Sequence, residues 1–353
     1  MHMADALLSP AIGATFWAAS AGTLAWCSKR LRSDARDHLA PLMGVLGAFV
    51  FAAQMINFTI PGTGSSGHVG GGMLLSILLG GPAAFVVIAS VLTMQALFFA
   101  DGGLLALGAN IFNLGMFPCF IAYPLIYRPL AKAAGTTPAK GRLVLITVLA
   151  TMVGLQLGAL GVVTQTQLSG ISSLPLSTFL LLMQPIHLAI GLVEGLATAA
   201  LIAFIREARP DLVDVGNASA VRVPTAFPTR IVAVLAGFAL VTGGLFSWFA
   251  SANPDGLEWS IEKVTGKPEA GTGGAVHQAF GQLQQRIALM PDYKFAQPEQ
   301  TTADTAGESG SGETWPAIDA GTSTAGVLGG LGTLLLVTVI GYLLRPRRSR
   351  ATE

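Results

Sequence analysis

Long apolar runs separated by short polar loops follow one another along most of the chain. These runs occupy about residues 11–26, 41–58, 108–127, 143–164, 176–205, 230–250 and 326–344. An α-helix needs roughly 20 apolar residues to cross a bilayer, and most of these runs are long enough. The pattern therefore predicts an all-α polytopic membrane protein.

The stretch 71–100 has two interpretations. As one long helix, it would place the basic loop around Arg128 and Arg142 outside the cell. A break at Gly80-Gly81-Pro82 instead gives a short segment (71–79) and a full one (83–99), and returns every basic loop to the cytoplasm. We choose the break, because Pro82 lacks a backbone donor. A segment this short rises only about 14 Å, so it must be shielded by protein rather than lipid.

Charge sets the predicted topology. No basic residue precedes the run that starts at Ala11, while Lys29, Arg30 and Arg32 follow it, which places the amino terminus outside. We divide the chain into a seven-segment bundle (1–205), a cytoplasmic linker (206–229) and a two-span domain (230–353). The last contains an external segment (251–325), with disorder expected over 301–324 because Thr, Ser, Gly and Ala dominate there. We expect a bacterial cytoplasmic (inner) membrane location and a cytoplasmic carboxyl end.

Composition supports this class and excludes several others. Hydrophobic residues make up 52% of the chain and charged residues 11%, and the net charge of +1 does not suggest a nucleic-acid partner. Cys27 and Cys119 lie within apolar stretches, so no disulfide framework is expected. Gly266-Lys267 is followed by Pro268, and no phosphate-binding loop motif occurs elsewhere, so ATP hydrolysis by that route belongs to a partner. We therefore expect a transporter subunit without catalytic residues or a resident cofactor.

The first two residues carry the most specific candidate chemistry. A free Met1 amine, the His2 backbone amide and the His2 imidazole offer three nitrogens in one plane. Ni(II) and Cu(II) accept such square-planar nitrogen ligation more readily than Zn(II) or Mg(II). A fourth nitrogen has to come from elsewhere in the chain.

His68 is the candidate for that nitrogen. It lies in Gly64-Ser-Ser-Gly-His-Val-Gly-Gly-Gly72, a loop predicted to be external and to precede the short segment. Glycines let the backbone approach another chain end closely. By itself the loop is equally compatible with a solvated histidine. Its pairing with an external Met1-His2 favours a ligand set of Met1, His2 and His68.

Four further polar residues are candidates for supporting roles. His187 and Glu194 fall on one face of the seventh segment, and ionisable groups inside membrane helices are often functional. For these two we favour pairing with other helices to fix packing over a functional role. Asn110 and Asn113 also share one helix face and could hydrogen-bond to the ligands, with interhelical packing as an equal alternative.

Four motifs together resemble the substrate-capture (M, or S-type) component of energy-coupling factor transporters for nickel and cobalt. They are Met1-His2-Met-Ala-Asp-Ala-Leu-Leu-Ser-Pro10, Ser66-Gly-His-Val-Gly-Gly-Gly72, Gly108-Ala-Asn-Ile-Phe-Asn-Leu-Gly115 and His187-Leu-Ala-Ile-Gly-Leu-Val-Glu-Gly195. The resemblance implies six core helices plus an amino-terminal one, with the metal held by the Met1 amine, the His2 amide and imidazole, and His68. Asn253-Pro-Asp-Gly-Leu-Glu-Trp259 makes the last third resemble the two-span N component, here fused to the M component.

The expected function is metal capture for an ATP-driven importer, with nickel favoured over cobalt and a link to cobalamin synthesis in the cobalt case. The resemblance implies ATPase subunits and a transmembrane coupling (Q/T) subunit as partners, in addition to the lipid bilayer. The alternative is a stand-alone secondary metal permease or channel. A membrane protease is disfavoured, since His187 is not part of a His-Glu-x-x-His motif.

Overall fold

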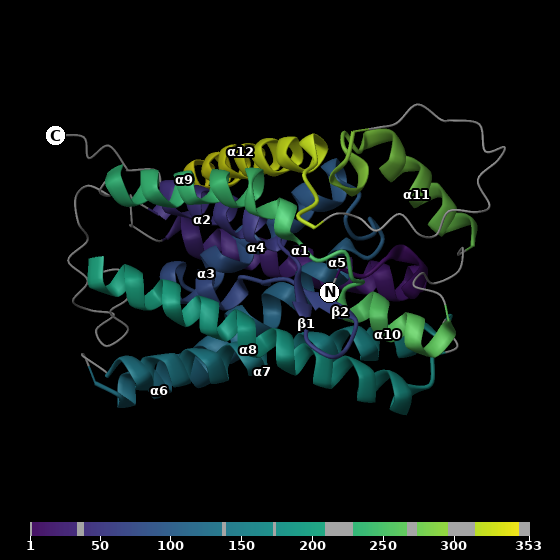
Figure 1. Ribbon diagram of the computed structural model, residues 1–353, viewed down its shortest axis with the longest axis horizontal. Coiled ribbons are helices and arrows are strands. Elements are labelled where there is room, and N and C mark those ends of the chain that lie inside the picture. The colour runs from purple at the N-terminus through teal and green to yellow at the C-terminus, as the bar shows by residue number, and fades with distance from the viewer. Residues whose placement is uncertain are drawn as a thin grey trace.

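The computed structural model describes residues 2–33, 39–135, 139–171, 174–208, 229–266, 274–295 and 315–345. It is a helical bundle whose helices run roughly along the long axis of the molecule (Figure 1). Helices α7 (Lys140–Ser169) and α8 (Leu176–Ala208) lie along one side, and α9 (Thr229–Gly244) and α12 (Ala320–Leu343) lie along the opposite side. Between them are α1 (Pro10–Arg32), α2 (Leu39–Gln54), α3 (Gly72–Leu79) and α4 (Gly81–Phe98).

The predicted break in the 71–100 stretch is confirmed. Helix α3 ends before Gly80, and α4 starts at Gly81 with Pro82 in its first turn. Gly80 has φ +85° and ψ 156°, a conformation that side chains disfavour and glycine accepts. Helix α3 is buried along its whole length. Its shortness therefore exposes no unpaired backbone to lipid, as the membrane setting requires.

Helix α5 (Leu107–Ile111), η2 (Phe112–Tyr127) and α6 (Arg128–Ala133) form one continuous helix. Its middle part, η2, has the wider π-helical hydrogen-bonding pattern and contains Pro118 and Pro124. Each proline removes a backbone donor and crowds the preceding turn, which favours a wider turn over a regular α-helix. The continuous helix is longer than the predicted run 108–127.

In the part of the chain that the structure describes, five helices are long and apolar enough to cross a membrane. They span Gly81–Phe98, Leu107–Ala133, Lys140–Ser169, Leu176–Ala208 and Ala320–Leu343. Helices α2 and α9 are apolar but shorter, and α1 mixes apolar with small and polar residues. The multi-pass, all-helical class is thus confirmed, while the count of seven plus two spans stays a prediction.

Helix α4 lies at the centre of the core and is buried on nearly all sides, with Phe85 and Ile88 fully enclosed. Helices α7 and α8 instead keep outward rows of exposed leucines, including Leu145, Leu149, Leu181 and Leu188. A bundle in lipid is expected to show this pattern, because lipid chains solvate leucine as well as the core does.

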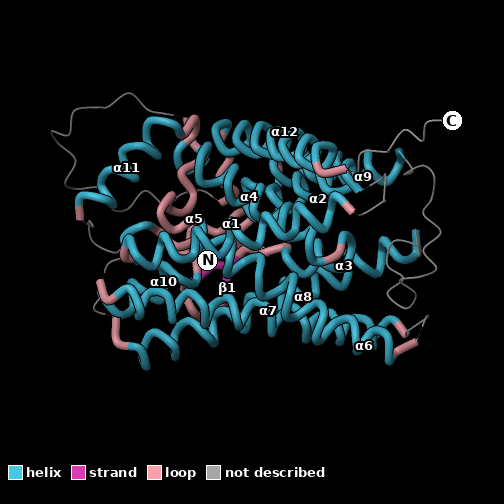
Figure 2. Tube along the Cα trace, turned by 180° about the vertical axis from the view of Figure 1, so that it is seen from behind, coloured by secondary structure: helices cyan, strands magenta, loops and turns pink. Residues whose placement is uncertain are grey.

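Several short elements gather at one end of the bundle. The strands β1 (Phe58–Ile60) and β2 (Ser65–Gly67) form an antiparallel hairpin with Phe58 opposite Gly67, an element that the apolar pattern did not predict. Helices α10 (Gly256–Thr265) and α11 (Ala275–Ile287) lie in the same half of the molecule as the hairpin (Figure 2), and the turn η5 (Pro291–Tyr293) follows α11 in the chain. These three come from the predicted external segment.

The structure bears on two predicted segments, the disorder expected over 301–324 and the linker 206–229. Residues 301–314, where disorder was expected, lie outside the described residues, but residues 320–324 form the first turn of α12, so the expectation is wrong for them. Asp319 caps that turn by accepting a hydrogen bond from the Thr322 N–H at 2.7 Å. Most of the predicted linker 206–229 also lies outside the described residues, although α8 continues to Ala208.

Candidate metal site

The amino-terminal segment lies between two loops at the end of the bundle that carries the hairpin. The Met3 N–H donates to Asn110 Oδ1 at 2.8 Å, and Met3 O accepts from the Gly103 N–H at 3.0 Å. Asp5, in the short helix η1 (Asp5–Leu7), accepts a hydrogen bond from the Ala106 N–H at 2.9 Å. Met3 is fully buried. The segment is therefore fixed in place directly beside His2.

The structure brings His2 and His68 together. Their imidazole rings are stacked with centroids 5.1 Å apart and planes inclined by 18°. His2 Nδ1 lies 2.8 Å from Asp101 Oδ1, and the His2 side chain is only 10% exposed. His2 Nε2 is buried and has no hydrogen-bond partner among the described residues. Two stacked imidazoles, one of them next to the chain terminus, are suitable ligands for a single metal ion.

Electrostatics also favour a cation here. Burial lowers the pKa of His68 to about 3, so this imidazole is neutral at physiological pH, the form that binds metals. Burial by itself would raise the pKa of Asp101, but the adjacent His2 and the Tyr293 hydroxyl hold it below its ordinary value. Asp101 is therefore a carboxylate, and it is stabilised by the Tyr293 hydroxyl at 2.5 Å.

Met1, the third predicted ligand, lies outside the described residues. Within the described part of the chain, no group of three or more His, Cys, Asp or Glu side chains is arranged to hold a metal ion. A site built on His2 and His68 thus needs backbone or terminal nitrogens, as the sequence predicts. The ligand set of Met1, His2 and His68 stays a prediction.

Asn110 and Asn113 lie next to the amino-terminal segment. Asn110 bonds both the N–H and the carbonyl of Met3, through Oδ1 and Nδ2. Asn113 exchanges two hydrogen bonds with the Gln165 side chain of α7, at 2.7 and 2.9 Å. Asn110 therefore positions the residue that follows His2, while Asn113 mainly joins η2 to α7.

Glu194 reaches the glycine-rich loop from α8, and His187 on the same helix lines a cavity beside that loop. The two Glu194 carboxylate oxygens accept hydrogen bonds from the Gly70 and Gly71 N–H groups at 3.0 and 2.9 Å. These amides immediately precede α3, where a helix amino terminus favours negative charge. His187 Nδ1 donates to the Met183 carbonyl at 2.8 Å, while its Nε2 has no hydrogen-bond partner among the described residues. Glu194 thus orders the loop that carries His68.

The described parts of the segment 251–325, predicted to be external, contact each loop around the site, which the sequence did not predict. The Ser66 N–H donates to Pro254 O at 2.8 Å, and Ser66 and Asp255 form a parallel β-bridge. The Trp259 indole donates to Thr63 O at 3.0 Å. These bonds join the Pro-Asp-Gly-Leu-Glu motif to the hairpin before His68. The motif was visible in the sequence, but its place beside the histidine was not.

Helix α11 and η5 contact the amino-terminal segment and the loop that carries Asp101. Gln284 Nε2 donates to Ala96 O and Gly102 O at 3.0 and 2.7 Å, bracketing Asp101. His277 Nε2, on α11, donates to Leu8 O at 2.8 Å. Tyr293 reaches Asp101 directly. The carboxyl-terminal third therefore covers the site rather than only extending the bundle.

The fold and the site together define a membrane-embedded metal transport protein. Residues 2–212 match the family model described as the cobalt uptake substrate-specific transmembrane region, CbiM, and residues 229–346 match the PDGLE domain. The chain belongs to the CbiM family and carries a PDGLE domain after it. The predicted kinship with fused nickel and cobalt transport proteins is confirmed.

Individual relatives agree with this assignment. The putative fused nickel transport protein NikMN of Archaeoglobus fulgidus is 36% identical over 214 residues, which cover 61% of this chain and 68% of the relative. The fused nickel transport protein NikMN of Rhodobacter capsulatus is 31% identical over 298 residues, or 80% of this chain and 83% of the relative. A solved structure described as a truncated transition metal transporter is 30% identical with a TM-score of 0.51, covering 59% of this chain and 99% of that one.

Proposed function

We propose that this chain is the metal-capture subunit of an ATP-driven energy-coupling factor importer, with Ni(II) as its preferred ion and Co(II) as the second. The single observation that carries the proposal is the stacked pair of His2 and His68 beside Asp101. The Met1 amine and the His2 amide complete a planar set of four nitrogens. Such a set favours Ni(II). Two fused nickel transport proteins among the relatives support the same choice.

ATP hydrolysis and coupling are assigned to separate ATPase and transmembrane subunits. The chain contains no phosphate-binding loop motif, and the described core has no line of charged residues for ion-coupled transport. The proposed division is a capture domain (1–205), a linker (206–229) and an N-like domain (230–353) that covers the site. In this scheme the external segment retains the ion until the coupling subunits reorient the capture domain.

Orientation is part of the proposal. Among the described residues, basic side chains gather at the end of the bundle away from the site, including Lys29, Arg30, Arg32, Arg128, Lys132, Lys140, Arg142, Arg206 and Arg345. Only Lys263, Arg286 and Lys294 belong to the described elements at the site end. This asymmetry favours a cytoplasmic location for the far end and an external one for the site.

The test is uptake of radioactive nickel by cells that express the chain with its partner subunits. A few residues added before Met1 should abolish uptake, because the terminal amine would become an amide. The same residues added after Glu353 are the matched control and should leave uptake intact. Normal uptake by the amino-terminally extended protein would overturn the capture site. Uptake by the purified chain alone in liposomes would instead favour a stand-alone permease.

A further inference from the structure

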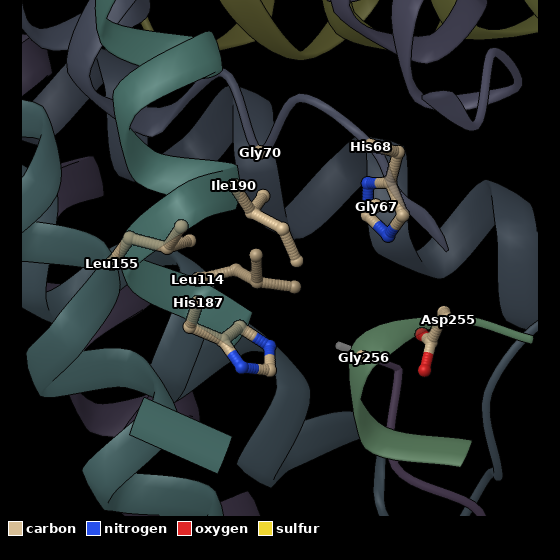
Figure 3. A pocket seen from close by; sticks show the side chains of 9 residues that line it. All are labelled: Gly67, His68, Gly70, Leu114, Leu155, His187, Ile190, Asp255 and Gly256. Atoms are coloured by element: carbon tan, nitrogen blue, oxygen red, sulfur yellow. The ribbon is translucent and has the colours of Figure 1, made fainter. Parts of the chain in front are cut away.

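A small cavity lies directly beneath His68 and is bordered by three ionisable side chains. Its volume is about 10 Å³, close to the room that one water molecule or one ion occupies. Figure 3 shows the side chains of His68, His187 and Asp255 around this space, with Leu114 and Ile190 forming an apolar wall. The three ionisable groups come from the glycine-rich loop, from α8 and from the start of α10.

The burial and hydrogen bonding of the His187 imidazole are those expected of a metal ligand. It is 1% exposed. A carbonyl oxygen can only accept, so the bond to Met183 O places the proton on Nδ1 and leaves a lone pair on Nε2. Nε2 has no hydrogen-bond partner among the described residues. A backbone carbonyl that fixes the distal ring nitrogen is the usual support of a metal-binding histidine.

Asp255 contributes the negative charge on the opposite side of the cavity. It caps α10 by accepting from the Leu257 and Glu258 N–H groups at 2.8 and 2.9 Å. Gly256 lets this cap approach α8, because a Cβ at that position would lie 2.5 Å from Ile186 Cγ2 and 3.1 Å from His187 Cε1. The close fit of Gly256 against α8 places Asp255 on the wall of the cavity that His187 also lines.

We propose that this cavity is a second, inner position for the transported ion, with His187 Nε2 as its new ligand, His68 as the ligand shared with the capture site, and Asp255 as the counter-charge. The inference rests on the proposed function, since it extends the path of the same ion. Imidazole and carboxylate are suitable ligands for both Ni(II) and Co(II).

Two observations favour a transfer position over a storage site. The described residues contain no preformed group of three such ligands, so the ion would be held less tightly here than by four planar nitrogens. A transported ion must be able to leave each position that it enters. A second cavity of about 20 Å³ shares Gly70, Leu114 and Leu155 with the first and is lined by Asn113, Thr151 and Glu194. The polar side chains of the second cavity thus extend the possible path of the ion beyond His187.

The first experiment separates the inner position from the capture site by blocking the latter. Full-length protein with residues added before Met1 is titrated with Co(II), and the visible absorption of the ion is recorded. Two imidazoles and two water molecules should give a weak complex with the intense bands of tetrahedral Co(II). These bands should disappear in the extended protein when His187→Ala is added. No bands in the extended protein, or bands that survive His187→Ala, would overturn the proposal.

Asp255→Asn is the second variant, because asparagine still caps a helix while the charge is lost. It should weaken the Co(II) bands of the extended protein without lowering its melting temperature. Glu262→Gln, an exposed position on the same helix, is the matched control and should leave them unchanged. Equal weakening by both variants would contradict a role for Asp255.

The second experiment uses the native amino terminus and the partner subunits. His187→Ala should still bind one equivalent of Ni(II) with unchanged affinity, yet its uptake should fall by at least about tenfold, the scale of losing one supporting metal contact. Uptake at the wild-type rate would overturn the inner position and leave the capture site standing. Loss of equilibrium Ni(II) binding in His187→Ala would also overturn it, because His187 would then support capture itself.

Discussion

At the scale of single residues, the His2 imidazole has two competing partners. A chelate ring that includes the His2 backbone nitrogen must use Nδ1, the ring nitrogen nearer to Cβ. In the structure this nitrogen is hydrogen-bonded to Asp101. Losing that bond costs about 1–3 kcal/mol. A carboxylate about 5 Å from a divalent ion gains roughly 7 kcal/mol at an effective dielectric of about 20, before desolvation. The attraction between the Asp101 carboxylate and the ion therefore outweighs the loss of its hydrogen bond to His2 Nδ1. We conclude that Asp101 promotes capture of the metal ion.

This balance predicts the effect of Asp101→Asn. The variant should lower Ni(II) affinity by roughly 10–100-fold, the usual range for residues that support metal ligands. Isothermal titration of the purified protein with its native amino terminus measures the change. Asp292→Asn removes the same charge from an exposed position next to Tyr293 and should bind like the wild type. Unchanged Ni(II) affinity in Asp101→Asn would show that the loss of the hydrogen bond to His2 cancels the attraction between the carboxylate and the ion.

At the scale of elements, α8 determines the shape of the glycine-rich loop. Glu194 accepts hydrogen bonds from two backbone N–H groups, those of Gly70 and Gly71. Ile190, one turn earlier, packs against Gly67 so closely that a Cβ there would lie 2.5 Å from its Cγ1. Ile190 and Glu194, on one face of α8, thus fix the loop on both sides of His68. The loop is ordered by this helix, even though its composition suggests flexibility.

Glu194→Gln is the corresponding prediction. An amide has one oxygen, so one of the two loop N–H groups would face an NH₂ group and lose its partner. The free energy of unfolding should fall by about 1–3 kcal/mol. Hydrogen exchange over residues 65–72 should become faster at the same time. Glu207→Gln on the same helix removes only an exposed pair with Lys140, so neither measurement should change. Equal exchange rates in both variants would contradict the role of Glu194.

At the scale of the whole molecule, the fused carboxyl-terminal domain encloses the site. Its helices α9 and α12 pack on α2, while α10, α11 and η5 reach the loops that carry His68, Asp101 and the amino-terminal segment. Both histidines are consequently buried to about nine tenths, with 10% and 9% exposure. Entry or exit of an ion therefore requires some of these contacts between the domains to open.

Trp259→Phe tests that coupling, because it removes the single indole hydrogen bond to Thr63 O. Release of bound Ni(II) to a chelator should accelerate by roughly 2–10-fold, the equivalent of about 0.5–1.5 kcal/mol. Trp248→Phe is the matched control. It removes an indole bond to Ser323 Oγ within the carboxyl-terminal domain, away from the site, and should release Ni(II) at the wild-type rate. Equal rates in all three proteins would contradict a retaining role for α10.

The sequence by itself determined the features that depend on neighbouring residues. Apolar runs gave the helices, Gly80 and Pro82 gave the break between α3 and α4, and the motifs around His2 and His68 identified the family. Such features are legible because helix periodicity and backbone restrictions act over a few residues. Only the tertiary structure decided which distant groups meet. Asp101 and Asp255 have no local signal as partners of the histidines, since loop packing across 99 and 187 residues of chain brings them there (His2 to Asp101, His68 to Asp255).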